Sequence, residues 1–158
     1  MTVIEKANPL KQDRNGLTIP LYALIYNKEQ NLNLSPNQIM SLLEKTDLSM
    51  QDSRGSIPPL YILHHNKDNN LNLSPNQLMT ILEKSDLLLQ DQNGFTAVMY
   101  LLNNNRQENL NLSPKQIISI LEKSDLTVQN ISGFTIPMFV LWNNKSKNLM
   151  EQPYQCTF

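Results

Sequence analysis

The chain has 158 residues, of which 17% are charged, and a formal net charge of −1. This length suffices for one domain with a hydrophobic core, and the charge balance excludes the basic stripe that nucleic-acid binding requires. No apolar run approaches the roughly 20 residues of a membrane span, and the opening residues MTVIEKANPL lack the regions of a secretory signal. The single cysteine, Cys156, cannot form an internal disulfide, which favours a reducing, cytoplasmic compartment.

A repeat of 39 residues dominates the sequence. The string NLNLSP begins at Asn31, Asn70 and Asn109, and the four glycines keep the same spacing. Such periods are typical of stacked repeat architectures. The opening segment VIEKANPLKQD aligns with LLEKTDLSMQD of the next repeat, which indicates that the chain opens inside a second helix. We therefore divide the single domain 1–158 into a half repeat (1–12), three full repeats (13–51, 52–90, 91–129), a half repeat (130–147) and a C-terminal capping tail (148–158).

Each repeat begins with a predicted turn. Gln-Asp or Gln-Asn stands before every glycine, and two residues separate the Asx from the Gly, as in Asp13-Arg-Asn-Gly16. An Asx side chain accepts hydrogen bonds from nearby backbone amides, and glycine adopts positive φ without steric cost. We therefore expect a tight turn with a left-handed glycine at Gly16, Gly55, Gly94 and Gly133.

A short apolar segment follows each turn, as in LTIPLYALIYN and FTAVMYLLNNN. The alternation of these segments would also suit a strand, but prolines at 20, 58, 59 and 137 favour the first turn of a helix, where no backbone donor is lost. We predict a buried first helix of about nine residues in each repeat. Threonines at 18, 96 and 135 are the expected N-caps. The asparagines at 27, 66, 105 and 144 follow these helices, where a left-handed residue is expected.

The second helix of each repeat has the clearest start signal. In SPNQIMSLLEK, Ser35 is the predicted N-cap, Pro36 is the first helical residue, and Gln38 completes a capping box. The same device recurs at Ser74 with Gln77 and at Ser113 with Gln116. Neither helix of a repeat can bury its apolar face alone, so the repeats must stack. The sequence thus predicts an all-α solenoid of helix-turn-helix repeats with seven helix segments, the first and last being halves of pairs.

These residues resemble an ankyrin repeat. The stretch Asp91-Gln-Asn-Gly94-Phe-Thr96 is similar to the family's β-turn Asp-x-x-Gly-x-Thr, and Gln77-Leu-Met-Thr-Ile-Leu-Glu-Lys84 is similar to its second helix. The resemblance covers essentially the whole chain. It departs from the family in its period, which is 39 residues instead of 33, in the long loop between the helices, and in Leu or Met where the family has His (Leu21, Leu60, Met99, Met138). The family's Gly-Ala-Asp after the second helix is Thr-Asp or Ser-Asp here.

Four residue sets have alternative interpretations. The His64-His65 pair suggests a metal site, but no Cys or carboxylate cluster accompanies it, so a polar surface pair is favoured. Cys156 lacks a partner base and is interpreted as an incidental thiol. The Glu-Lys columns (44–45, 83–84, 122–123) are interpreted as a solvated face. The column Tyr22, Tyr61, Tyr100 and Phe139 could be an aromatic ladder, but the ankyrin register places it in the core, with each hydroxyl needing a partner.

The sequence contains no phosphate-binding loop, catalytic triad or paired-carboxylate constellation, so we expect no enzyme activity, cofactor or metal. The ankyrin register implies a concave face made by the turns and by the ends of the first helices. These positions change chemistry from repeat to repeat while the core columns stay apolar. Trp142 in particular could instead be partly buried between repeats. The candidate partner-binding residues are Arg14, Leu17, Tyr26, Arg54, His65, Phe95, Asn104, Phe134 and Trp142.

The expected function is a monomeric protein–protein interaction module. Asparagine is enriched, with 21 residues, and the chain resembles ankyrin proteins of intracellular bacteria, which implies delivery into a host cell without a signal peptide. Two alternatives stay open. The chain could be a targeting segment of a larger multidomain enzyme or effector, or a structural spacer that assembles through its exposed ends.

Overall fold

The computed structural model describes residues 8–105, 108 and 110–144. Within them the chain is all-α, as predicted, with seven helices packed against one another and three isolated β-bridges beside the turns. None of these helices has the length and apolar character needed to span a bilayer. The helices are α2 (Ile19–Tyr26), α3 (Pro36–Leu43), α4 (Pro58–His65), α5 (Pro75–Glu83), α6 (Ala97–Asn104), α7 (Pro114–Leu121) and α8 (Ile136–Asn144).

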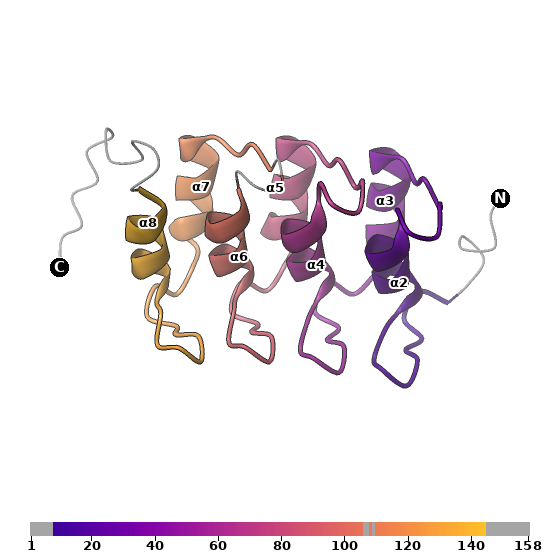
Figure 1. The fold of residues 1–158 in the computed structure, drawn as a ribbon, viewed down its shortest axis with the longest axis horizontal. Helices are drawn as coiled ribbons and strands as arrows, with labels where there is room; N and C mark the ends of the chain where they lie inside the picture. The colour runs from indigo at the N-terminus through magenta and orange to yellow at the C-terminus, as the bar shows by residue number, and fades with distance from the viewer. Residues whose placement is uncertain (1–7, 106–107, 109, 145–158) are drawn as a thin grey trace.

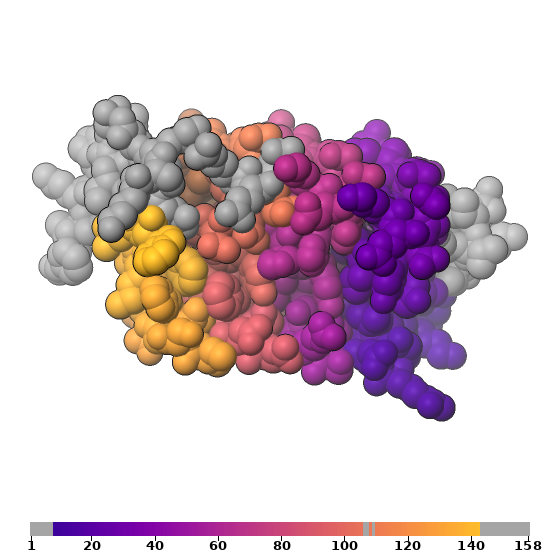
Figure 2. Space-filling view, in the orientation of Figure 1, coloured from indigo at the N-terminus to yellow at the C-terminus, as the bar shows by residue number. Residues whose placement is uncertain are grey.

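The helices form two layers along the long axis of the molecule (Figure 1). The first helices α2, α4, α6 and α8 lie side by side in one layer, and α3, α5 and α7 form the other. The turns project from the same side of this row, and the units appear as successive bands in Figure 2. We refer to residues 13–51, 52–90, 91–129 and 130–144 as units 1 to 4.

The pairing of the helices differs from the prediction at the N-terminal end. Seven segments are present in the described residues, but only the last, α8, is unpaired, because α2 already pairs with α3. The predicted opening half repeat falls mostly on residues 1–7, which lie outside the described residues, and residues 8–12 form no helix. The predicted capping tail, 148–158, also lies outside the described residues.

The helix starts follow the sequence signals. All three second helices have a complete capping box, in which the serine hydroxyl accepts a hydrogen bond from the N3 amide and the N3 glutamine accepts one from the serine amide. Thr18 and Thr96 cap α2 and α6 through their hydroxyls, as predicted. In unit 2 the equivalent residue is Ile57, which makes no such bond. There, Pro58 and Pro59 occupy the first turn. Proline has no backbone N–H, so two of the amide donors that a helix N-terminus leaves unpaired are absent.

The prediction of left-handed asparagines after the first helices is wrong for Asn27, Asn66 and Asn105. Their φ angles are −52°, −55° and −50°, which are right-handed helical values. The left-handed asparagines instead lie in the loop that precedes the second helix, in the NLN string. Asparagine tolerates this conformation better than other residues with a side chain. Among the described residues, the asparagines with positive φ are Asn31, Asn33, Asn70, Asn72 and Asn111.

Asn27 and Asn66 are buried connectors instead. Each is at most 1% exposed. The Oδ1 atom of Asn66 accepts a hydrogen bond from the Leu73 amide at 2.9 Å, and its Nδ2 donates to the Glu108 carbonyl oxygen of unit 3 at 3.3 Å. Asn27 does the same with Leu34 and with the loop of unit 2. A buried amide needs such partners, and here they tie each loop to the next one.

One continuous hydrophobic core passes through the units, from Leu24 in α2 to Phe139 in α8. It is built mainly from Leu and Ile side chains of both helix layers, together with leucines of the loop such as Leu71 and Leu110, which are fully buried. Since the core is shared between neighbours, no unit has a complete core of its own.

Candidate functional site

The four turns are held by the same set of hydrogen bonds. In unit 2 the Asp52 Oδ1 atom accepts hydrogen bonds from the Arg54 and Ser56 amides, both at 2.8 Å, and the Gly55 amide donates to the Asp52 carbonyl oxygen at 3.0 Å. Gly55 has φ of +74°, as predicted. The equivalent Asx residues, Asp13, Asp91 and Asn130, make the same two side-chain bonds. Each turn therefore presents the two residues between Asx and Gly at its tip in the same geometry.

Backbone hydrogen bonds hold neighbouring tips in register. The Gln92 amide donates to the Arg54 carbonyl oxygen at 2.7 Å, and Ser53 and Ile131 bond in the same way to the preceding tip. A glutamine side chain adds a second link: Gln90 Nε2 donates to the carbonyl oxygens of Gly94 at 2.6 Å and of Gln129 at 2.8 Å. Gln12 and Gln51 repeat this pattern. The spacing between tips is therefore fixed by the fold.

The aromatic column is tied to the turns through aspartate. The Tyr61 hydroxyl donates to Asp52 Oδ2 at 2.7 Å, and the Tyr100 hydroxyl donates to Asp91 Oδ2 at 2.8 Å. Burial raises the pKa of both tyrosines above their usual range, and the hydrogen bond to a carboxylate raises it further. The partner that each tyrosine hydroxyl was expected to need is thus an aspartate carboxylate of the same unit. Both tyrosine rings are half-buried.

The column changes character at its two ends. In unit 4 both partners are replaced together, since Asn130 stands in place of the aspartate and the buried Phe139 in place of the tyrosine. In unit 1 the Tyr22 side chain is 50% exposed and its ring lies 4.5 Å from that of Tyr26. The predicted core position therefore holds for Phe139, which belongs to the hydrophobic core. Tyr61 and Tyr100 are half-buried, and Tyr22 is exposed.

Aromatic rings form a connected stripe across units 2 to 4. Within it, the His64 ring lies 5.2 Å from the Tyr100 ring, and the Phe95 ring lies 5.5 Å from the Phe139 ring, so two contacts cross from one unit to the next. The remaining contacts join neighbours within a unit. In order along the stripe the rings are Tyr61, His65, His64, Tyr100, Phe95, Phe139 and Phe134.

The histidine pair belongs to this stripe. The two rings are 4.3 Å apart at 74°, and Asn104 Nδ2 lies 3.5 Å from His64 Nδ1. Burial lowers the pKa of His65, and the neighbouring His64 lowers it further, while Glu108 and Asp68 act in the opposite direction. In the described part of the chain, no three His, Cys, Asp or Glu residues are grouped in a way that could hold a metal ion.

The structure separates the predicted partner-binding residues into three groups. Arg14 and Arg54 are exposed at turn tips, and Phe134 and Trp142 are 39% and 69% exposed at the end of the row. Trp142 is therefore not buried between units. Four residues are half-buried along the first helices and turns: Leu17, Tyr26, His65 and Phe95.

Asn104 is a correction to the predicted surface. Its side chain is only 4% exposed, and Nδ2 donates to the Leu63 carbonyl oxygen of unit 2 at 3.3 Å. A partner protein cannot reach it, because the neighbouring first helix covers it. Asn104 joins units and does not belong to the exposed face.

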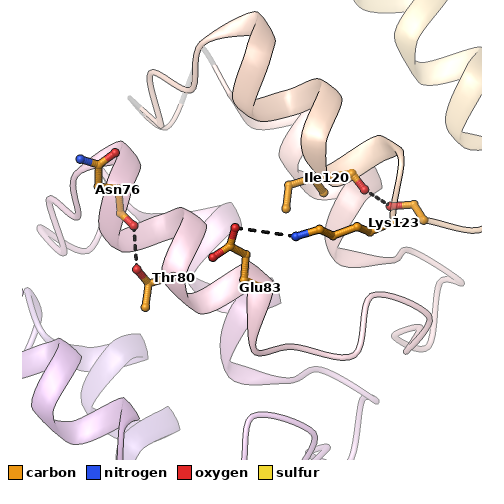
Figure 3. Close-up of polar contacts among 6 residues, drawn as sticks. Asn76, Thr80, Glu83, Ile120 and Lys123 are labelled. Atoms are coloured by element: carbon orange, nitrogen blue, oxygen red, sulfur yellow. Dashed lines mark hydrogen bonds and ion pairs between the residues drawn. The ribbon is translucent and has the colours of Figure 1, made fainter.

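The Glu-Lys columns lie on the second-helix layer, away from the stripe. Lys123 Nζ lies 3.7 Å from Glu83 Oε1, joining adjacent units, and both side chains are about half exposed (Figure 3). An exposed pair of this kind contributes little to stability. The solvated-face interpretation fits this geometry.

Sequence reasoning missed two elements of the site. The buried Glu108 carboxylate accepts hydrogen bonds from the Lys67 and Asp68 amides of unit 2, at 3.1 and 3.4 Å, and no local pattern marks this residue. The Asp–Tyr link was also missed, although the joint change to Asn130 and Phe139 in unit 4 is a visible signal of it.

No family model matches the chain, and no curated protein matches it either. The described architecture, with seven helices packed against each other, is compatible with a helical repeat protein.

Proposed function

We propose that the chain is a non-enzymatic protein-binding module with an ankyrin-like solenoid fold, and that its partner binds the face made by the turns and first helices. One observation carries this proposal. The turn frameworks are nearly identical, whereas the displayed pair of residues differs in every unit: Arg14-Asn15, Ser53-Arg54, Gln92-Asn93 and Ile131-Ser132. Only Asn15 and Asn93 are alike at equivalent positions.

Preorganisation gives this arrangement its physical rationale. The tips are held by Asx side chains and by unit-to-unit hydrogen bonds, so ordering them on binding costs little conformational entropy. Binding energy usually concentrates in a few arginine and aromatic side chains. Arg54 is exposed at the tip of unit 2, and its charge acts on Tyr61, the first ring of the aromatic stripe.

The second candidate is a targeting segment of a larger multidomain enzyme or effector, in which another region carries the chemistry. The variable residues at the turn tips support this candidate as well, because a targeting segment also needs a surface that binds one particular protein. A longer reading frame around this segment would distinguish the two, since it would add a domain with its own active site. A cytoplasmic protein and one delivered into a host cell both suit the reducing environment favoured by a lone cysteine.

The test is a quantitative pull-down from lysate, followed by affinity measurement with the captured protein. Arg54→Ala and Tyr26→Ala should each weaken binding by about tenfold or more if they are central contacts. Lys84→Ala is the matched control for Arg54, because it removes an exposed positive charge from the second-helix layer. Loss of binding by the first two variants, with melting unchanged, supports the proposal. Equal binding by all three variants would show that the partner uses another face.

A further inference from the structure

The last first helix exposes side chains that are buried in every preceding unit. Met138 is 48% exposed, whereas Met99 at the same position of α6 is 0% exposed. Leu141 is 57% exposed, whereas the equivalent Leu102 is 6% exposed. In the earlier units the turn and first helix of the next unit cover these positions, as α8 covers α6. We define the C-terminal face as Phe134, Met138, Leu141 and Trp142, which are all exposed. Within the described residues it is one side of a unit junction, and no later unit packs on it.

The N-terminal end of the row carries the opposite side of such a junction. In the interior, the aromatic column contacts the preceding unit: Tyr100 meets His64 at 5.2 Å, and Phe139 meets Phe95 at 5.5 Å. Tyr22 belongs to the same column, but no earlier unit contacts it within the described residues, and its side chain is 50% exposed. Its ring is available for the contact that its equivalents make.

The side chains at the two ends are the counterparts of residues that touch across the interior junctions. Equivalent residues are separated by multiples of the 39-residue period. Phe134 is the equivalent of Phe95, and Trp142 is the equivalent of His64. If a second copy of the chain followed unit 4 in the same register, its Tyr22 ring would meet both Phe134 and Trp142 of the first copy. All three aromatic side chains are exposed. Aromatic pairs at such distances add stability beyond the area that they bury.

The hydrogen-bonding groups of the two ends are complementary as well. Interior tips are joined by an amide of one unit and a carbonyl oxygen of the unit before it. At the ends of the row the equivalent groups are the Arg14 amide and the Ser132 carbonyl oxygen. The glutamine link runs in the opposite direction, from the earlier repeat to the later one. The Gln129 amide group of the first copy would therefore donate to the Gln12 carbonyl oxygen of the second copy, as Gln90 does to Gln129.

We propose that the C-terminal face binds the N-terminal end of a second copy, so that the chains associate head to tail and continue the row. This interface is a continuation of the junction already present three times within the chain. It is heterologous and does not close on itself, so longer assemblies grow with concentration. It replaces the monomer expected from the sequence. Of the candidate partner-binding residues, it uses Phe134 and Trp142, whereas Arg54 lies outside it.

The chain's own tail is the competing occupant. Within it, the residues QPYQ at 152–155 align in register with SPNQ at 35–38, three periods earlier. The tail sequence therefore aligns with the NLNLSP string and the residues after it. It contains no Asx-x-x-Gly motif and no counterpart of the apolar segment that covers this face in the interior units, which is why a second copy is the better match.

The test uses two full-length variants, each blocked at one end. Leu141→Glu places a charge on the C-terminal face, and Tyr22→Glu places one on the N-terminal end; both positions are exposed, so the fold should tolerate them. In sedimentation velocity, the average mass of the wild type should rise with concentration. Each variant alone should associate about tenfold or more weakly than the wild type, and it should stay monomeric at concentrations where the wild type associates. The reason is that the introduced charge would be desolvated at the junction.

The mixture of the two variants provides the decisive measurement. Each contributes one intact end, so together they should form a one-to-one dimer that grows no further. Association of Tyr22→Glu alone would indicate symmetric packing of two C-terminal faces and would overturn the proposal. A wild type that stays monomeric at all concentrations would overturn it too, and deletion of residues 148–158 would then show whether the tail covers the face. Arg54→Ala should associate like the wild type, which separates this result from partner binding.

Discussion

The segments that open units 3 and 4, taken with the glutamine before each, are QDQNGFTAVMYLL and QNISGFTIPMFVL. They share Gln, Gly, Phe, Thr, Met and Leu at equivalent positions, and they fold into the same turn and first helix. Their surroundings differ completely. In unit 3 the turn, the glutamine and the helix all contact a following unit, whereas α8 exposes the corresponding apolar side chains to solvent. The comparison shows that the repeat sequence determines the turn and the helix, whereas contact with the following unit determines which side chains are buried. Each prediction below compares a residue at an interior junction with its counterpart where that junction is missing or altered.

The glycine of the turn should show the largest difference. A Cβ at Gly94 would lie 2.8 Å from Asn130 Cα, whereas one at Gly133 would meet nothing within 4 Å. Both have positive φ, +74° and +78°. Gly133→Ala should cost only the left-handed strain, about 1–2 kcal/mol, and Gly94→Ala should cost about 2–5 kcal/mol because overpacking is added. Urea denaturation of both variants measures the difference. Gly94→Val should be more costly still.

Equal losses for the two alanine variants would contradict the close approach of unit 4 to Gly94. A Gly133→Ala variant as stable as the wild type would contradict the strain assigned to positive φ.

The buried asparagines should come next. Asn66→Ala leaves the Leu73 amide and the Glu108 carbonyl oxygen without their partner, which should cost about 2–3 kcal/mol. Asn105 is half-buried, and its Nδ2 bonds within its own unit, to the Leu112 carbonyl oxygen. Asn105→Ala should therefore cost less, about 1–2 kcal/mol. Thermal melting of both variants gives the order, and a reversed order would show that the bond between units adds no stability.

The Asp–Tyr link should have a smaller effect. Asp91→Asn weakens the acceptor of the Tyr100 hydroxyl and should cost about 1–2 kcal/mol, within the range for hydrogen bonds to charged groups. The double variant Asp91→Asn with Tyr100→Phe reproduces the residues of unit 4, and it should recover part of that loss. Stability losses that simply add in the double variant would mean that the two side chains are not coupled.

The same variant can be followed through ionisation of the tyrosine. The folded state raises the pKa of Tyr100, so it favours the neutral ring, and this contribution to stability is complete below the ordinary value of 10.0 and is lost at higher pH. Asp91→Asn removes the carboxylate but not the burial, so the pKa of Tyr100 should fall part of the way back. Tyrosinate absorbance, compared with Tyr100→Phe, measures this shift.

The glutamine link should show the smallest effect. Gln90→Ala removes hydrogen bonds to the Gly94 and Gln129 carbonyl oxygens and should cost about 1 kcal/mol. Gln129 is exposed, and the described part of the chain contains no later turn whose carbonyl oxygen could accept a hydrogen bond from its amide group. Gln129→Ala should change the melting temperature little. A loss at Gln129 as large as at Gln90 would contradict the assignment of the stabilisation to the unit junction.

The sequence by itself determined the features that depend on neighbouring residues in the chain. The capping box at Ser35 and the positive φ of Gly16 arise within four residues, so local patterns predict them. The period of 39 residues also predicts stacked helix pairs, because neither helix of a unit can bury its apolar face alone.

Only the tertiary structure decided which residues the neighbouring units cover. Asn66 and Asn104 look like surface residues in the sequence, but they are buried because the next or preceding unit supplies their hydrogen-bond partners. Met138 looks like a core residue, but it is half exposed, since no later unit packs on it within the described residues. Burial of these residues depends on contacts with residues about 40 positions away, in the adjacent unit. A local sequence pattern therefore cannot show whether that adjacent unit covers them.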